Sequence, residues 1–517
     1  MTVATGPGAG VAPARDPRPL AAGERIHVVG VAGAGASAAA LHARWAGADP
    51  DGCDAGGPSP YSVAVDAAGI TLAWQHDPAH VTRVPPPDRL AVTKALTAIA
   101  PDHPELVAAR GARIPIEPWQ QVIADAAVGR TLIGVAGTHG KSTSAGWLVH
   151  VLAAAGLDPA AFVGAILPAA LTGGLPATAR RGGGAAFVVE ADEYAGNFDA
   201  YHPSIGIVTS ADWDHPDVFA DRPAVVSAFD TWVRAMPEAG VVAINIADAG
   251  AAELASGLRD WAGWVVATAL VDDAEGHAAT VGAGMAEAYR TAAGPAKSLV
   301  GRIVRLEPDA TILEIHGLGE ARKALTVRLP SAGRHNAANA LGVAAAAAQA
   351  GVRPAEIVTG LASFRGIGRR LERKGEVSGV VVYDDYGHHP TAIRSTLAAI
   401  RQREPGKRVW AVYEPLTYHR TAALLDAFAD ALAEADGVAI ADIWAGRDPD
   451  TTIVSAAALA DAVADRNARI AVAAPGSVEM TASWLAHEVR SGDAVLVMGG
   501  GRSYRIAELL VEALADR

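Results

Sequence analysis

The chain has 517 residues, 50% of them hydrophobic and 19% charged, with a formal net charge of −13 and an isoelectric point near 5.7. A chain of this length is too long for one hydrophobic core and predicts about three domains. The negative charge argues against a surface that coats nucleic acid, although a local basic pocket could still hold phosphate groups, and small anionic substrates remain possible.

The N-terminal segment, residues 1–22, contains proline and glycine but no continuous apolar stretch, so we interpret it as a flexible tail and not as a secretory signal. The single cysteine, Cys53, excludes an intramolecular disulfide and a zinc site with several cysteines, and it fits a reducing compartment. The most apolar later stretch, residues 340–351, is short and is interrupted by Gln349. We expect a cytoplasmic protein that binds neither a membrane nor nucleic acid.

Two segments share a strand–turn–helix plan. Residues 25–30, RIHVVG, form a β-branched run that is followed by a glycine-rich turn and an alanine-rich helical segment. Residues 129–142, GRTLIGVAGTHGKS, repeat this plan. Each segment predicts the start of an α/β domain.

Strand and helix patterns continue to the C-terminus. Strands are predicted at 185–192, 204–211, 240–245, 311–317 and 324–330, and helices through 335–363. The segment 364–375, FRGIGRRLERKG, is typical of a hinge. After it, further strands alternate with helical stretches, as in a doubly wound parallel sheet, at 379–386, 408–415, 437–444, 469–475 and 493–500.

These patterns predict an α/β fold with three domains after the tail. Residues 23–127 form an N-terminal Rossmann-like domain, residues 128–363 form a central P-loop domain, and residues 364–517 form a C-terminal doubly wound Rossmann-like domain.

The stretch VAGTHGKSTS, residues 135–144, predicts a phosphate-binding loop. Gly140, Lys141 and Ser142 lie between a strand and an apolar helix, where backbone N–H groups can surround phosphates, a lysine can reach the terminal phosphates and a hydroxyl can bind Mg²⁺. The strict motif has glycine at the position of Val135. The alternative is a glycine-rich turn with an incidental lysine.

Acidic residues at later strand ends support the phosphate site. Glu190 ends one predicted strand and Asp214-His215 follow the next, at the sheet edge where α/β proteins bind ligands. Carboxylate, imidazole and serine hydroxyl groups could together hold magnesium between phosphate oxygens. A single strand-end glutamate is more often part of a solvated turn, but three such elements in order argue against that alternative.

Six stretches of this chain resemble the Mur ligase family, in its order and at compatible spacings. They are GTHGKST (137–143), EADEY (190–194), DWDHPD (212–217), GRHNAANA (333–340), GRRL (368–371) and DDYGHHPT (384–391). The last stretch resembles the branch that joins L-alanine to UDP-N-acetylmuramate, and a relative that ligates recycled tripeptide. The resemblance implies an ATP-dependent, ADP-forming carboxylate–amine ligase of peptidoglycan synthesis that works through an acyl phosphate.

The resemblance also implies roles for individual residues. ATP would contact Gly137, Thr138, Gly140, Lys141, Ser142, Thr143, Asn339, Arg370 and Asp385. Two Mg²⁺ ions are implied, one held by Ser142 and Glu190 and one placed with the help of His215. His335 and Asn336 would introduce a helix, and Asn339 would meet adenine. Lys141, His215, Arg370 and His388 would be catalytic, with His388 near the incoming amino acid.

The first domain has a glycine pattern with two interpretations. Gly30, Gly33 and Gly35 have the spacing GxxGxG, and Asp54 follows at the distance of a Rossmann acid that contacts ribose. Motif matching alone would suggest an NAD site. The resemblance implies that this domain binds the UDP part of the substrate, with Gly33, Gly35 and Asp54 as contacts. His76 is either a further substrate contact or a surface histidine.

Three positions depart from the pattern of the alanine-adding branch. Thr417 replaces the first arginine of the block PLTYHRT (415–421), while Arg420, which would bind the amino-acid carboxylate, is present. Ala392 replaces an acid, and GGGR (499–502) replaces a GAGD block. We therefore predict L-alanine as the preferred amino acid, bound with weakened affinity, and glycine or L-serine as competing substrates. The alternative is a ligase that joins tripeptide or another amine. A monomer or a homodimer is expected.

Overall fold

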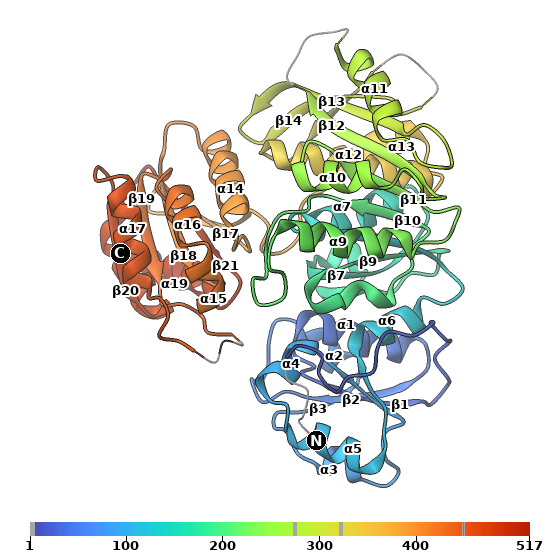
Figure 1. The fold of residues 1–517 in the computed structure, drawn as a ribbon. Coiled ribbons are helices and arrows are strands. Elements are labelled where there is room, and N and C mark those ends of the chain that lie inside the picture. Colours follow the sequence, from blue (N-terminus) through green and yellow to red (C-terminus); the bar gives the residue numbers. More distant parts are fainter. Residues whose placement is uncertain (1–5, 272–276, 320–323, 447, 449, 517) are drawn as a thin grey trace.

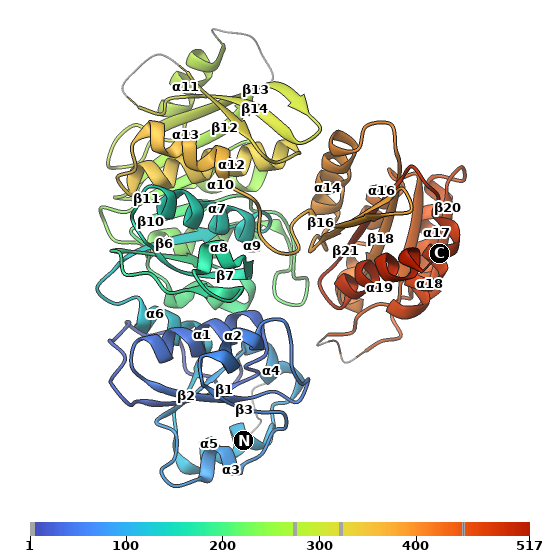
Figure 2. The same ribbon diagram turned by 180° about the vertical axis from the view of Figure 1, so that it is seen from behind.

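The computed structural model describes residues 6–271, 277–319, 324–446, 448 and 450–516 and arranges them as three α/β domains (Figure 1). The N-terminal and central domains are stacked, and the C-terminal domain lies beside this stack in both views (Figures 1 and 2). Within the described ranges, every helix is too short or too polar to cross a membrane.

The N-terminal domain is built on a five-stranded parallel sheet. Its strands are β1 (Arg25–Val29), β2 (Asp49–Cys53), β3 (Thr71–Ala73), β4 (Arg89–Val92) and β5 (Ile116–Pro118). Its helices are α1 (Ala34–Trp45), α2 (Ser62–Ala67), α3 (Ala79–Thr82), α4 (Lys94–Ile99), α5 (Pro104–Ala112) and α6 (Trp119–Ala126). The strand order β3-β2-β1-β4-β5 matches the first five strands of a Rossmann sheet. The strands stay parallel, and the order in which the chain adds them reverses between β1 and β4.

Alternation along β1 decides which helices cover each face of this sheet. Ile26 and Val28 pack with α1 and α6 in one core, whereas Val29 packs with α3 and α5 in another. His27 shares the second face, because it pairs with Glu105 of α5. The second face therefore carries polar as well as apolar side chains.

Residues 6–22 run along the same domain. Arg15 pairs with Glu117 and with Asp125, each at 2.8 Å, and the buried Arg89 contacts the same two carboxylates. Residues 1–5 of the predicted tail lie outside the described part of the chain. The bounds predicted for the tail and the domains stay a prediction.

The central domain contains a ten-stranded mixed sheet. Its strands are β6 (Thr131–Ala136), β7 (Ala160–Leu167), β8 (Ala177–Arg180), β9 (Ala186–Glu190), β10 (Ile205–Val208), β11 (Val241–Asn245), β12 (Trp264–Val271), β13 (Lys297–Glu307), β14 (Ala310–His316) and β15 (Leu325–Leu329). Its helices are α7 (Lys141–Ala154), α8 (Ala169–Thr172), the 3₁₀ helix η1 (Tyr194–Ala200), α9 (Arg222–Arg234), α10 (Ala249–Gly257), α11 (His277–Ala288), α12 (Arg334–Gln349) and α13 (Pro354–Ser363). The strand order β15-β14-β13-β12-β11-β10-β6-β9-β7-β8 places β6 between β10 and β9. The carboxyl ends of these three parallel strands therefore share one edge.

The C-terminal domain has a six-stranded sheet. Its strands are β16 (Glu372–Val377), β17 (Val380–Asp385), β18 (Arg408–Glu414), β19 (Gly437–Ala441), β20 (Ala471–Gly476) and β21 (Asp493–Gly499). Its helices are α14 (Pro390–Arg403), α15 (Tyr418–Ala423), α16 (Leu425–Leu432), α17 (Ala456–Arg466), α18 (Val478–Glu488) and α19 (Ser503–Ala515). The order β16-β17-β21-β18-β19-β20 is parallel except for β16, which pairs antiparallel with β17. The last four residues of the segment predicted as a hinge, 372–375, thus belong to an edge strand.

Candidate functional site

A glycine-rich loop connects β6 to α7 at the carboxyl edge of the central sheet. Gly137 and Gly140 have φ angles of 131° and 81°, in a region that residues with side chains rarely adopt. A Cβ atom at Gly137 would lie 2.1 Å from Thr209 Oγ1. The loop therefore requires glycine, and the N-terminus of α7 that follows is suited to bind an anion such as phosphate.

Lys141, the first residue of α7, is held by two carboxylates. Its Nζ lies 2.9 Å from Glu193 Oε2 and 3.5 Å from Asp192 Oδ1. Burial lowers the pKa of Lys141, but the Glu193 and Asp192 carboxylates outweigh this effect and hold the pKa above its ordinary value. Lys141 is therefore a fixed cation at the position where terminal phosphates are expected.

Ser142 and Glu190 meet at the same edge. Ser142 Oγ donates to Glu190 Oε1 at 2.9 Å, and Glu190 Oε2 accepts a hydrogen bond from Gly164 N at 2.6 Å. A hydroxyl and a carboxylate in contact offer the oxygen ligands that Mg²⁺ prefers. The structure brings this predicted pair together, with Thr138 and Thr143 in the adjoining loop and first turn of α7.

A second group of possible metal ligands lies beside the first. Asp192, Glu193 and His215 have ligand atoms that all lie within 4.8 Å of one another. His215 is the residue that the sequence predicts for a second ion, whereas neither carboxylate was predicted as a ligand. The signal was present in the stretch EADEY, in which only the acid at the strand end was chosen.

Arg370 connects the C-terminal domain to the phosphate loop. Its Nη2 donates to Ser142 Oγ at 2.7 Å, and its guanidinium lies 5.1 Å from the ring centroid of Tyr386. Arg370 Nε is buried and has no hydrogen-bond partner in the part of the chain that the structure describes. A phosphate oxygen could satisfy this donor.

Arg420 and His388 form a second contact between the domains, around Asp214. Arg420 Nε donates to Asp214 Oδ1 at 2.7 Å and Arg420 Nη2 lies 3.1 Å from His215 Nδ1. His388 Nε2 lies 4.0 Å from Asp214 Oδ2. Burial, followed by the Arg420 guanidinium, lowers the pKa of His388 well below its ordinary value, so this imidazole is neutral at neutral pH.

Further bonds close the same interface. Thr391 Oγ1 donates to Asp212 Oδ2 at 2.8 Å, and His389 Nε2 lies 3.0 Å from the Trp213 carbonyl oxygen. Asp212, His139 and His389 also form a cluster of possible metal ligands. None of these three residues was singled out from the sequence, because the contacts join segments about 180 residues apart.

Of the other two residues predicted to contact ATP, Asn339 lies next to the glycine-rich loop, whereas Asp385 binds the backbone of its own domain. Asn339 lies beside Gly140, where an added Cβ would be 2.7 Å from Asn339 Oδ1, and it lines a small cavity between α12 and the ends of β10 to β12. Asp385 accepts hydrogen bonds from Leu371 N at 2.8 Å and Gly387 N at 2.7 Å. In this conformation Asp385 orders its own loops, and its contact with ATP stays a prediction.

His335 and Asn336 lie in the first turn of α12, as the sequence predicts for residues that introduce a helix. Asn336 Nδ2 donates to the Ala332 carbonyl oxygen at 2.8 Å. Burial lowers the pKa of His335. The Asn336 side chain therefore helps to fix the turn that begins this helix.

The glycine turn of the first domain lies at the switch point between β1 and β4. Asp54 Oδ2 accepts a hydrogen bond from Ala32 N at 3.1 Å, which fixes the turn that leads through Gly33 into α1. A Cβ atom at Gly35 would lie 2.2 Å from the ring of Trp119, so this glycine serves helix packing. The UDP contacts proposed for these residues stay a prediction.

His76 lies apart from the phosphate loop. Its Nδ1 is 3.2 Å from Cys53 Sγ, and its ring centroid is 4.4 Å from that of His103. The side chain is half-buried and belongs to a group of histidines between β2, α3 and α5. Its predicted contact with the substrate stays a prediction.

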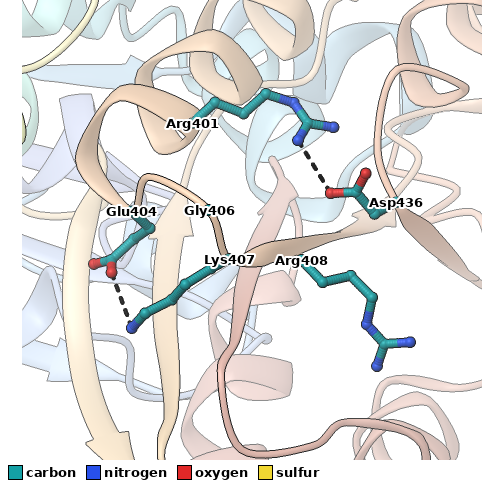
Figure 3. Close-up of a pocket in the computed structure, with 6 residues that line it drawn as sticks. All are labelled: Arg401, Glu404, Gly406, Lys407, Arg408 and Asp436. Atoms are coloured by element: carbon teal, nitrogen blue, oxygen red, sulfur yellow. Dashed lines mark hydrogen bonds and ion pairs between the residues drawn. The ribbon is translucent and has the colours of Figure 1, made fainter.

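An open hollow lies on the C-terminal domain at the start of β18 (Figure 3). It is lined by Arg401, Glu404, Gly406, Lys407, Arg408 and Asp436. Each of its cations has an acidic partner, with distances of 3.0 Å for Arg401–Asp436, 3.0 Å for Lys407–Glu404 and 2.6 Å for Arg408–Asp493. The hollow therefore lacks an unpaired positive charge for an anionic substrate.

Three family models match successive parts of the chain. Residues 25–131 match the model described as Mur ligase family, catalytic domain, and residues 135–347 match the Mur ligase middle domain. Residues 369–501 match the model described as Mur ligase, glutamate ligase domain. Together the matches span all three sheets.

Individual proteins show the same likeness. The chain is 34% identical to the UDP-N-acetylmuramate–L-alanine ligase of Frankia casuarinae over 95% of this chain and 98% of that protein. The structure of the UDP-N-acetylmuramate-alanine ligase MurC from Thermotoga maritima gives a TM-score of 0.72 at 23% identity, covering 94% of this chain and 98% of that one. A murein peptide ligase from Psychrobacter arcticus gives 0.69 at 23% identity, covering 96% and 99%.

Proposed function

The chain belongs to the Mur ligase family, and we propose that it is the ATP-dependent, ADP-forming ligase that joins the carboxylate of UDP-N-acetylmuramate to the amine of L-alanine in peptidoglycan synthesis. One observation supports the placement of the ATP site at the residues named above. Ser142 of the phosphate loop lies within hydrogen-bond distance of both Glu190 and Arg370, which come from different domains.

The chemistry explains why several cations must converge. A carboxylate is a poor acyl donor because its leaving group would be oxide, so phosphate is first transferred from ATP to form an acyl phosphate. The attacking carboxylate and the γ-phosphate are both anions. The backbone N–H groups before α7 bind the phosphates, and Lys141 and Arg370 neutralise charge that develops in both transition states.

The carboxylate groups of this site fit magnesium. Ser142 and Glu190 would hold one ion, and Asp192, Glu193 and His215 would hold a second. Bound magnesium supplies charge neutralisation between phosphate oxygens. When phosphate binds Lys141, the Glu193 carboxylate would be freed from its present contact and could then serve as a metal ligand.

The second inter-domain contact supports amine attack. L-Alanine is a zwitterion, so its ammonium must lose a proton before it attacks the acyl phosphate. The neutral His388 imidazole could accept a hydrogen bond from this group and orient it. Arg420 is already paired with Asp214, so we propose that it binds the alanine carboxylate only together with a rearrangement of this pair.

The remaining assignments follow from the proposed reaction. The turn of Gly33, Gly35 and Asp54 is the proposed UDP site, at the switch point where Rossmann sheets bind ligands. The proposed location is the cytoplasm, which supplies ATP. A monomer or homodimer is proposed, since all residues assigned to the site belong to one chain.

A tripeptide-recycling ligase is the second candidate. The short Thr417 side chain, in place of an arginine, is the feature that favours it, and the fold is shared with a murein peptide ligase as well as with MurC. A panel of acceptors separates the two: ADP release is measured with UDP-N-acetylmuramate and either single amino acids or preformed tripeptide. Turnover with L-alanine that exceeds turnover with glycine or L-serine supports the first proposal. Turnover with tripeptide alone would replace it.

A further inference from the structure

A group of metal-ligating side chains lies on the face of the first sheet that α3 and α5 cover. Its members come from five different segments of the domain. The reaction proposed above uses none of them except His76, which is predicted to contact the substrate. The members are His27, Cys53, His76, His80, His103 and Glu105.

The spacing of the ligand atoms fits a small tetrahedral ion. Cys53 Sγ lies 3.1 Å from Glu105 Oε2, His80 Nδ1 lies 2.7 Å from Glu105 Oε1, and His27 Nε2 lies 3.5 Å from Glu105 Oε2. One atom from each of these four residues lies within 4.8 Å of the others. Tetrahedral zinc, with bonds of about 2.0–2.3 Å, sets its ligands roughly 3.3–3.8 Å apart. The contacts of Glu105 with Cys53 and His80 are shorter and would lengthen when the ion binds, whereas that with His27 lies within this range.

The orientation of His27 is that of a metal ligand. Its Nδ1 lies 2.9 Å from Asp51 Oδ1, which is the carboxylate contact typical of a metal-bound histidine, and its Nε2 lies 3.5 Å from Glu105 Oε2 on the side of the ligand group. Residue His27 is 1% exposed, and Nε2 has no hydrogen-bond partner within the described ranges of the chain. A buried ring nitrogen without a hydrogen-bond partner is costly, and a metal ion bound between Nε2 and Glu105 would satisfy it.

His103 repeats this feature beside the four residues. It is 5% exposed, and neither ring nitrogen has a hydrogen-bond partner among the residues with a described structure. Its ring packs against His76, whose Nδ1 lies 3.2 Å from Cys53 Sγ. The pocket thus holds more nitrogen ligands than one ion needs, which leaves His76 or His103 as an alternate ligand.

We propose that His27, Cys53, His80 and Glu105 form a structural Zn²⁺ site in the N-terminal domain. Thiolate sulfur and imidazole nitrogen select zinc over magnesium or calcium, which prefer oxygen ligands. Thiolate and carboxylate together neutralise the double positive charge. Four protein ligands close the coordination shell, as in structural sites.

The site has a consequence for the neighbouring turn. Cys53 is the last residue of β2, and the next residue, Asp54, fixes the backbone of Ala32 in the turn before α1. A metal that joins β1, β2, α3 and α5 would therefore hold the end of β2 and, through it, this turn. Zinc binding itself does not depend on the proposed ligase activity.

Cobalt substitution tests the site. The full chain is dialysed against a chelator and titrated with Co²⁺, which gives visible bands in tetrahedral sites and a near-ultraviolet charge-transfer band with thiolate. Cys53 is the single cysteine, so this band reports on Cys53 alone. We expect one thiolate-bound Co²⁺ per chain, displaced by one Zn²⁺. Cobalt binding without the charge-transfer band, or no binding, would overturn the proposal.

Variants and a thiol assay complete the test. Cys53→Ser should abolish the charge-transfer band, and Asp51→Asn should weaken zinc affinity about 10–100-fold while every ligand is retained. His316→Gln is the matched control, a histidine near Glu314 but outside the group, and should leave affinity unchanged. In the unaltered chain Zn²⁺ should slow maleimide modification of Cys53. An unprotected thiol at saturating Zn²⁺ would contradict the site even if the variants fail to fold.

Discussion

The buried ion pair between Arg420 and Asp214 should control how the C-terminal domain closes on the central domain. The side chains are 2% and 5% exposed, and Arg420 Nε lies 2.7 Å from Asp214 Oδ1. Removal of one partner from a buried pair costs about 3–5 kcal/mol when the other charge stays buried. If the domains separate, the Asp214 carboxylate becomes hydrated again. The loss of Arg420 should therefore destabilise the closed arrangement of the domains and not the fold of either domain.

The size of the effect follows from that cost. A penalty of about 3 kcal/mol shifts the closed-to-open ratio by about 100-fold. Arg420→Met should therefore increase the radius of gyration measured by small-angle scattering, and it should lower kcat/KM for ATP because Arg370 no longer stays on Ser142. The double variant Arg420→Met/Asp214→Asn removes both charges and should recover much of the closed population.

A matched control uses an exposed ion pair of the same domain. Arg401 and Asp436 have side chains that are 43% and 39% exposed, and such pairs contribute about 0–1 kcal/mol. Arg401→Met should leave the radius of gyration unchanged. If Arg420→Met also leaves it unchanged, or if the double variant is as open as the single one, the pair does not hold the domains together.

Three further predictions concern single residues. Lys141→Ala should lower turnover about 1,000-fold or more while the fold stays intact. Lys297→Ala, at an exposed position, is the control and should leave turnover unchanged. Near-normal turnover of the Lys141→Ala variant would exclude a role of Lys141 in phosphate binding. Burial lowers the pKa of His42 from 6.5 to about 4, so its stabilising effect is complete above pH 6.5 and about 3 kcal/mol is lost as the pH falls to 4. His42→Gln should show a smaller acid loss in urea unfolding, and an equal loss would refute this origin. Thr417 has φ 63° and ψ 144°, a conformation that costs a non-glycine residue about 1–3 kcal/mol. Thr417→Gly should therefore raise the free energy of unfolding by about 1 kcal/mol, and Thr417→Ala should not. A lower free energy of unfolding in the glycine variant would contradict this.

The places of the glycine-rich loop and of Glu190 could be predicted because both depend on local pattern, whereas their contact with phosphate stays a prediction. An apolar strand followed by glycine, lysine and serine determines where the loop lies, and parallel strands end at one edge, so Glu190 had to approach Ser142. The carboxylates on Lys141 could not be placed in this way. Asp192 and Glu193 precede η1, where Ala195 and Gly196 take non-helical angles that no propensity indicates.

Strands with weak alternation were missed for a related reason. The sequence AAFVGAIL of β7 is apolar at nearly every position, which suits a buried strand and a buried helix equally. The zinc ligands proposed in the first domain were equally hidden. His27 and Glu105 are 78 residues apart and meet only because β1 and α5 pack on one face of the sheet, and no short cysteine–histidine spacing indicates them.

Oxygen transfer from the substrate carboxylate to phosphate tests the central claim most directly. UDP-N-acetylmuramate labelled with ¹⁸O at both carboxylate oxygens is incubated with the protein, ATP, Mg²⁺ and L-alanine, and the released phosphate and the amide product are analysed by mass spectrometry. An acyl phosphate requires one ¹⁸O atom in each phosphate and one in the new amide carbonyl. Unlabelled phosphate, or phosphate released without amide formation, would contradict the account.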